Sequence, residues 1–241
     1  MTKTLNECAL FDSMVNEIRL AYDAAADLSL GWRFLYSPKL TLTRNTGLAI
    51  FGYNPGGPAF EPPIPSVEAG NAWLTSVERW PSANTQPNFM RFMGKALRQV
   101  ANGQIAQYLT RSLTSNLIPF RSKSAMGLPR WAHDWGISFW TKHIELIRSQ
   151  EVIVAVGNAS GDSRSPFAGI AKVLLDQGAA LVASEDWPSG WGEQVVRFRR
   201  FSSGESTVSV IGVPHFSRFD TRDTKTIERV TTLMRDCRRL T

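Results

Sequence analysis

The chain has 241 residues, 43% of them hydrophobic, and a formal net charge of +6, so we expect one α/β core and a single domain over residues 1–241. Two distant cysteines, Cys8 and Cys237, argue against a disulfide framework, a Cys-rich metal site or an iron–sulfur cluster. No apolar run approaches the ~20 residues that cross a bilayer, and residues 1–7 do not resemble a secretory signal, so we expect a soluble cytoplasmic protein.

The first third of the chain contains a predicted helix, a predicted strand and a long irregular segment. Apolar residues at helical spacing predict a helix over residues 5–27. The apolar run at residues 47–53 predicts a buried strand, and Asn-Pro-Gly-Gly at residues 54–57 predicts a tight loop after it. Residues 58–87 are rich in proline and predict an irregular excursion, with at most a short helix near residues 67–77.

The rest of the chain alternates between helical and strand patterns, with Asn88 as the expected N-cap of the first helix. The expected helices cover residues 88–99, 137–149, 166–177 and 224–239. The expected strands cover residues 113–120, 152–156, 181–183, 194–201 and 207–213. Continuous apolar strands that alternate with helices predict an α/β fold, a three-layer αβα sandwich with a mostly parallel central sheet.

The positive charge is concentrated in the middle of the chain. Residues 88–150 contain nine basic residues and two acidic ones. The basic residues are Arg91, Lys95, Arg98, Arg111, Arg121, Lys123, Arg130, Lys142 and Arg148. Such a surface attracts polyanions, most commonly nucleic acid, although a solvated basic face without a ligand fits the pattern equally well.

Polar residues follow three of the predicted strands. Asn54 and Asn116 each end a strand with a carboxamide, and His215 follows a strand with an imidazole of near-neutral ordinary pKa. In an α/β sheet, ligands bind outside the carboxyl ends of the strands, so these three side chains are expected to meet in one cleft. Taken singly, each has a plain structural alternative: Asn54 as a turn residue, Asn116 as a buried amide bonded to backbone, and His215 as a surface residue.

These segments resemble the signatures of the uracil-DNA glycosylase superfamily. LAIFGYNPGG at residues 48–57 resembles the first signature, in the mismatch-specific and single-strand-selective branches that carry Gly-x-Asn-Pro-Gly. VPHFSRF at residues 213–219 resembles the second signature, a strand followed by His-x-Ser and a wedge loop. TSNLIPFRS at residues 114–122 is similar to the strand whose Asn reads the flipped base. The resemblance covers roughly residues 47–223, without a counterpart for residues 58–87.

The resemblance implies a monomeric, monofunctional DNA glycosylase without cofactor or metal, whose partner is DNA. Asn54 would position the attacking water, and His215 would stabilise the departing base. The residues implied to contact the base are Tyr53, Phe60 and Asn116. The residues implied to contact the DNA are Gly56, Arg121, Lys123, Phe216, Ser217 and Arg218, with Phe216 or Arg218 as the wedge that fills the vacated stack.

The sequence also departs from the family pattern, which leaves the substrate open. Pro214 precedes His215, where the family places proline after the histidine, and Tyr53 is bulkier than usual for its position. Uracil or another modified pyrimidine is the expected base, with hypermodified cytosine in phage DNA as an alternative. A catalytically silent nucleic-acid binder of the same fold is a further alternative. No lysine except Lys123 is a candidate for a covalent amine, so we expect base release by water.

Overall fold

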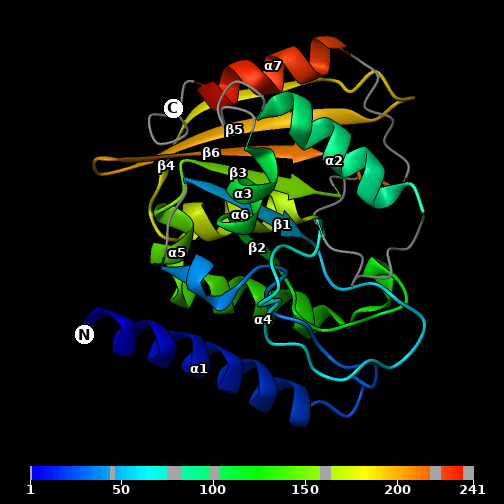
Figure 1. Ribbon diagram of the computed structural model, residues 1–241, viewed down its shortest axis with the longest axis vertical. Coiled ribbons are helices and arrows are strands. Elements are labelled where there is room, and N and C mark those ends of the chain that lie inside the picture. The colour runs from blue at the N-terminus through cyan, green and yellow to red at the C-terminus, as the bar shows by residue number, and fades with distance from the viewer. Residues whose placement is uncertain are drawn as a thin grey trace.

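The computed structural model describes residues 2–43, 47–74, 83–97, 104–157, 164–217 and 224–235. Its centre is a six-stranded sheet with the order β2-β1-β3-β6-β5-β4 (Figure 1). The strands are β1 (Leu48–Gly52), β2 (Leu113–Asn116), β3 (Val152–Val156), β4 (Ala180–Pro188), β5 (Val195–Ser203) and β6 (Ser206–Val213). One sheet therefore joins segments from the first quarter of the chain to those near its end.

The sheet is mixed, which corrects the expectation of a mostly parallel one. The strands β2, β1, β3 and β6 pair in parallel, whereas β5 is antiparallel to both β6 and β4. The β5–β6 connection contains only Gly204 and Glu205, and so short a loop can join only antiparallel neighbours. Gly204 has a positive φ of 59°, a conformation that glycine adopts without a steric penalty.

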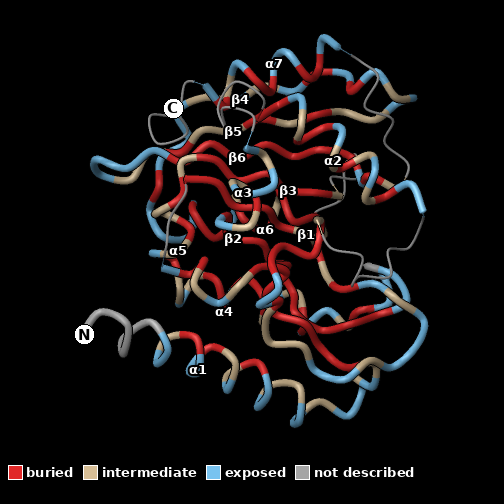
Figure 2. Tube along the Cα trace, viewed as in Figure 1, coloured by how far each residue is buried: buried red, intermediate tan, exposed pale blue. Residues whose placement is uncertain are grey.

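Helices cover both faces of the sheet, which makes the α/β architecture compatible with three layers. The helices are α1 (Thr2–Asp23), α2 (Thr85–Ala96), α3 (Ile105–Thr110), α4 (Arg130–Lys142), α5 (Ile144–Arg148), α6 (Pro166–Asp176) and α7 (Thr224–Arg235). Phe51 of β1 belongs to the hydrophobic cluster under α1, α4 and α6, whereas its neighbour Ile50 belongs to the cluster under α2 and α7. This alternation along a strand buries the parallel strands from both sides (Figure 2).

Most of the described elements match the sequence expectations, but the helices differ in several places: α1 ends at Asp23 rather than at residue 27, and α3 was not expected. The strand at residues 152–156 is confirmed. Helix α2 begins at Thr85, so Asn88 lies inside the helix and is not its N-cap. The helix expected at residues 137–149 is two helices that meet at His143, and the first of them, α4, already begins at Arg130.

Residues 31–37 run beside β2 at the edge of the sheet, and we refer to them as the edge segment. Its backbone donates to the carbonyls of Thr114 and Pro119 on one side and to that of Ile64 on the other. The first part of the proline-rich excursion is therefore docked against this edge segment. Within the described ranges, no helix has both the length and the apolar character needed to cross a membrane.

Candidate functional site

The three polar candidates, Asn54, Asn116 and His215, lie at or just beyond the carboxyl ends of parallel strands. Gly52 pairs with Asn116, and the registers of β1, β3 and β6 bring Val156 and Val213 into the same row. Asn54 and His215 each lie two residues beyond this row. Two strand spacings of about 4.8 Å separate β1 from β6 at this row, a distance of roughly 10 Å.

Hydrogen bonds fix the orientation of the Asn54 carboxamide. Its Nδ2 donates to the Ser122 Oγ at 2.8 Å and to the carbonyls of Pro55 at 3.0 Å and Phe120 at 3.3 Å. The Ser122 hydroxyl donates its single hydrogen to the Ser124 carbonyl at 2.6 Å, so its oxygen can only accept from Asn54. If the amide were flipped, its Oδ1 would face these three acceptors and could form a hydrogen bond with none of them. The Oδ1 atom is therefore presented away from the loop, and no residue in the described ranges donates to it.

Asn116 holds a buried donor that is poorly satisfied. The residue is 6% exposed, and its Nδ2 makes no hydrogen bond of good geometry with a described residue, although the amide lies close enough to the Tyr36 hydroxyl to lower the pKa of that group. The absence of a side chain at Gly52 is required here, because a Cβ at that position would lie 2.1 Å from the Asn116 Oδ1. Leaving a buried amide N–H without a good partner costs about 1–3 kcal/mol of stability. A ligand that brings a hydrogen-bond acceptor to this position would remove part of that cost.

His215 is exposed and held in one tautomer. The backbone N–H of Ser217 donates to its Nδ1 at 3.2 Å, and the Ser217 Oγ lies 2.7 Å from the same nitrogen. Because Nδ1 accepts from the backbone, the proton of the neutral imidazole sits on Nε2. The ring lies beside Gly157, where an added Cβ would be 3.7 Å from the His215 Cδ2. The imidazole can thus offer an Nε2–H donor at the strand edge.

The two aromatic candidates for base contact occupy different environments. Tyr53 is 8% exposed, and its hydroxyl lies 3.2 Å from the Nδ1 of His133 on α4, with the two rings stacked at 6.0 Å. Phe60 is 61% exposed on the proline-rich excursion. Phe60 is therefore not a packed core residue, whereas Tyr53, the neighbour of Asn54 in the chain, belongs to the hydrophobic core.

The structure corrects the predicted wedge at Phe216. This side chain is 0% exposed and packs against Phe89, Phe92 and Trp73, with ring centroids 5.4, 5.5 and 6.2 Å away. The Asn88 Nδ2 also donates to its carbonyl at 2.9 Å. Phe216 is thus a core residue that anchors the His215 loop to α2, while the other wedge candidate, Arg218, lies outside the described residues.

Phe216→Ala is expected to reduce the free energy of unfolding by about 3–5 kcal/mol, because it removes a buried ring and leaves a cavity. Chemical denaturation monitored by circular dichroism measures this loss. A wedge residue would behave in the opposite way, with stability unchanged and binding to duplex DNA weakened.

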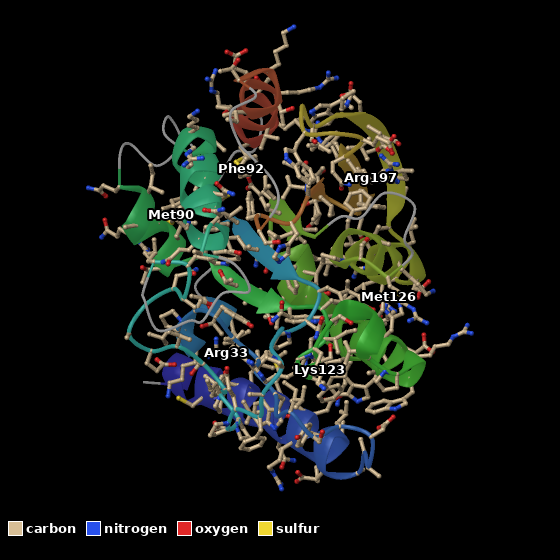
Figure 3. All side chains as sticks on the ribbon, turned by 90° about the vertical axis from the view of Figure 1, so that its right-hand side faces the viewer. Arg33, Met90, Phe92, Lys123, Met126 and Arg197 are labelled. Carbon is tan, nitrogen blue, oxygen red and sulfur yellow. The ribbon has the colours of Figure 1, made fainter. Side chains whose placement is uncertain are left out.

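The predicted DNA contact by Arg121 is also corrected. Its side chain is 3% exposed and its Nη2 binds the Gly56 carbonyl and the Glu61 carboxylate, both at 2.9 Å. Lys123, two residues further on, is exposed (Figure 3). Among the other basic residues of the central stretch in the described ranges, Arg91, Lys95, Arg111 and Arg130 are also exposed. Lys142 and Arg148 form ion pairs with Glu17 and Glu145.

Sequence reasoning missed Ser122, which orients Asn54, and two buried residues of the edge segment, Arg33 and Tyr36. Ser122 is 68 residues from Asn54, so no local pattern connects them. Within the described ranges, no group of three His, Cys, Asp or Glu side chains is placed to hold a metal ion. Comparisons with protein-family models, curated proteins and solved structures find no match to this chain.

Proposed function

We propose that the protein is a monofunctional DNA glycosylase that flips a uracil or modified pyrimidine out of DNA and hydrolyses its N-glycosidic bond. Extrusion is required because the bond between sugar and base cannot be reached inside the stacked duplex. The exposed basic residues on α2, on α4 and around Lys123 would hold the phosphates during this step. The products are the free base and an abasic site.

The proposed chemistry assigns each of the three polar side chains a separate task. Asn54 accepts a hydrogen bond from water through Oδ1 and holds that water toward C1′ of the sugar. The water oxygen bonds to C1′ as the glycosidic bond breaks, and the bonding electrons leave with the base. His215 donates Nε2–H to the developing anion, where a preorganised donor is most effective, and the water proton finally passes to the departing base. Asn116 donates Nδ2 to the base.

The observation that carries the proposal is the complementary pair of carboxamides at the ends of two adjacent strands, with Asn54 just after β1 and Asn116 at the end of β2. Asn54 presents an oxygen acceptor on an amide whose nitrogen is engaged by Ser122, and Asn116 presents a buried Nδ2 that makes no hydrogen bond of good geometry with a described residue. A water and a nucleobase edge supply the matching donor and acceptor. A catalytic amine is not part of this chemistry, so sodium borohydride should trap no adduct between protein and DNA.

The test is a panel of oligonucleotides, each with one altered base, incubated with the protein and then treated with alkali to cleave abasic sites. The panel contains uracil, other deaminated bases, hydroxymethylcytosine and glucosylated hydroxymethylcytosine, in single and double strands. We expect a fragment from at least one pyrimidine substrate. Fragments from none, with DNA binding retained, would instead support a nucleic-acid binder without catalysis.

A further inference from the structure

The loop after β1 and the loop after β2 are joined beside Asn54. Gly56 and Ser122 form a parallel bridge, in which the Gly57 N–H donates to the Ser122 carbonyl and the Ser122 N–H donates to the Pro55 carbonyl, both at 3.2 Å. The Ser122 Oγ also accepts from the Asn54 Nδ2 at 2.8 Å. The segment directly after Ser122 is therefore anchored beside the Asn54 carboxamide.

Residues 123–127, which we refer to as the 123–127 turn, lie between two buried residues, Ser122 and Leu128. Leu128 belongs to the hydrophobic core. Within the turn, the Ser124 carbonyl accepts from the Ser122 hydroxyl at 2.6 Å and from the Gly127 N–H at 2.9 Å. The buried ends and these internal hydrogen bonds fix the shape of the turn and its position relative to the site.

Met126 places an apolar side chain at the surface of this turn. It is 67% exposed, the highest value among the large hydrophobic side chains of the described ranges. Lys123 is exposed on the same turn, and Figure 3, which looks onto the edge where the parallel strands end, labels both residues. The turn thus combines a cation that can bind phosphate with a flexible apolar side chain that gains by leaving water.

Phe60, which is 61% exposed, is the other exposed apolar side chain on these two loops. Phe60 and Met126 each lie four residues beyond the bridge that joins the loops. Residues 54–66 contain no Lys or Arg, whereas Lys123 lies three residues before Met126. Of the two apolar side chains, Met126 is therefore the one that has a cation beside it to hold a phosphate.

Extrusion of a base leaves a gap in the duplex stack, at a cost of a few kcal/mol. Proteins that unstack DNA insert apolar side chains, methionine among them, between base steps. Such a side chain has to be exposed in the free protein and close to the group that acts on the extruded nucleotide. Phe216 does not meet the first requirement, because it is fully buried. Met126 meets both.

We propose that Met126 enters the gap left by the extruded base, with Lys123 on a neighbouring phosphate, and that the preferred substrate is therefore duplex DNA. The proposal rests on the proposed glycosylase function. Insertion stabilises the extruded state because the methionine side chain leaves water and contacts the base pairs that border the gap. A single strand has no continuous stack to restore, so insertion contributes little there.

Single-turnover excision by Met126→Ala, with the pyrimidine that the oligonucleotide panel identifies, tests this role. The rate on a duplex should fall about tenfold, and the rate on the same base in a single strand should change less than about twofold. Met126→Leu should keep most of the duplex rate, because leucine is also apolar. Leu175→Ala is the matched control: this side chain is 50% exposed near the start of β4, at the opposite edge of the sheet, and both rates should stay unchanged.

A duplex with a tetrahydrofuran abasic analogue tests insertion without any excision, because its stack already has a gap. In fluorescence anisotropy, we expect the wild type to bind this duplex about tenfold more tightly than an unmodified duplex. Met126→Ala should lose most of that preference, whereas Leu175→Ala should keep it. Circular dichroism should show both variants folded, since both side chains are exposed.

The two assays separate this proposal from the glycosylase proposal. If no base is excised but the preference for the abasic duplex depends on Met126, the glycosylase proposal fails and insertion by Met126 stands. If a base is excised and Met126→Ala matches the wild type in both assays, the reverse holds. Insertion by Met126 is also overturned if the wild type has no preference for the abasic duplex, or if Phe60→Ala or Arg218→Ala removes that preference while Met126→Ala keeps it.

Discussion

Asn54→Ala is expected to reduce the rate of base excision by about 100-fold or more, because it removes the acceptor that holds water toward the sugar. Affinity for the substrate oligonucleotide should be retained, since Asn54 does not carry the positive charge that binds phosphate. Single-turnover excision and fluorescence anisotropy measure the two quantities. Asn16→Ala, on the exposed face of α1, is the control and should leave both unchanged.

Ser122→Ala separates the orientation of Asn54 from its presence. This variant keeps the carboxamide but removes the oxygen that accepts its Nδ2 at 2.8 Å. We expect an intermediate loss of excision rate with little change in substrate affinity. If Ser122→Ala retains the full rate while Asn54→Ala loses it, the hydrogen-bond chain through Ser122 is not needed for catalysis. If both variants retain the full rate, water positioning by Asn54 is wrong.

His215→Ala is expected to reduce the single-turnover excision rate by about 10²- to 10³-fold, the usual effect of deleting one donor to a developing oxyanion. The structure suits this role because Nδ1 accepts from Ser217 and leaves the proton on Nε2. Folding should be preserved, because His215 is exposed.

His215→Gln provides the sharper comparison with His215→Ala. A glutamine side chain places an amide N–H near the position of Nε2, so it should recover part of the lost rate. A glutamine variant no better than alanine would point to a role other than hydrogen-bond donation. The loss of excision rate in His215→Ala should also be smaller for substrates whose base leaves more readily, because such a base needs less stabilisation of its negative charge.

The parts of the fold that could be predicted are those with strong local patterns. The five apolar residues of β3 and the proline-started helix α6 are examples, because burial on both faces and an N-terminal proline are visible in the sequence. The mixed sheet was missed because strand direction depends on the connection as well as on the apolar pattern. The two-residue β5–β6 connection is the signal that would have indicated an antiparallel pair.

The candidate site was predictable in its position and less so in its contacts. Strand ends pointed to Asn54, Asn116 and His215, and the register brings these positions to one edge of the sheet. The environment of Phe216 was not visible, because its aromatic neighbours come from another part of the chain. Arg121 was interpreted as a surface cation because its type is usually exposed, yet tertiary contacts with Gly56 and Glu61 bury it.

The anchoring of Phe216 also determines how movement passes through the molecule. A carbonyl bonded to Asn88 and a ring enclosed by α2 aromatics fasten the chain one residue after His215 to that helix. A displacement of α2 is therefore expected to move the backbone that carries the imidazole as well. A bound polymer that displaced α2 would therefore also move the Nε2–H donor. The alignment of that donor would then depend on how the polymer contacts α2.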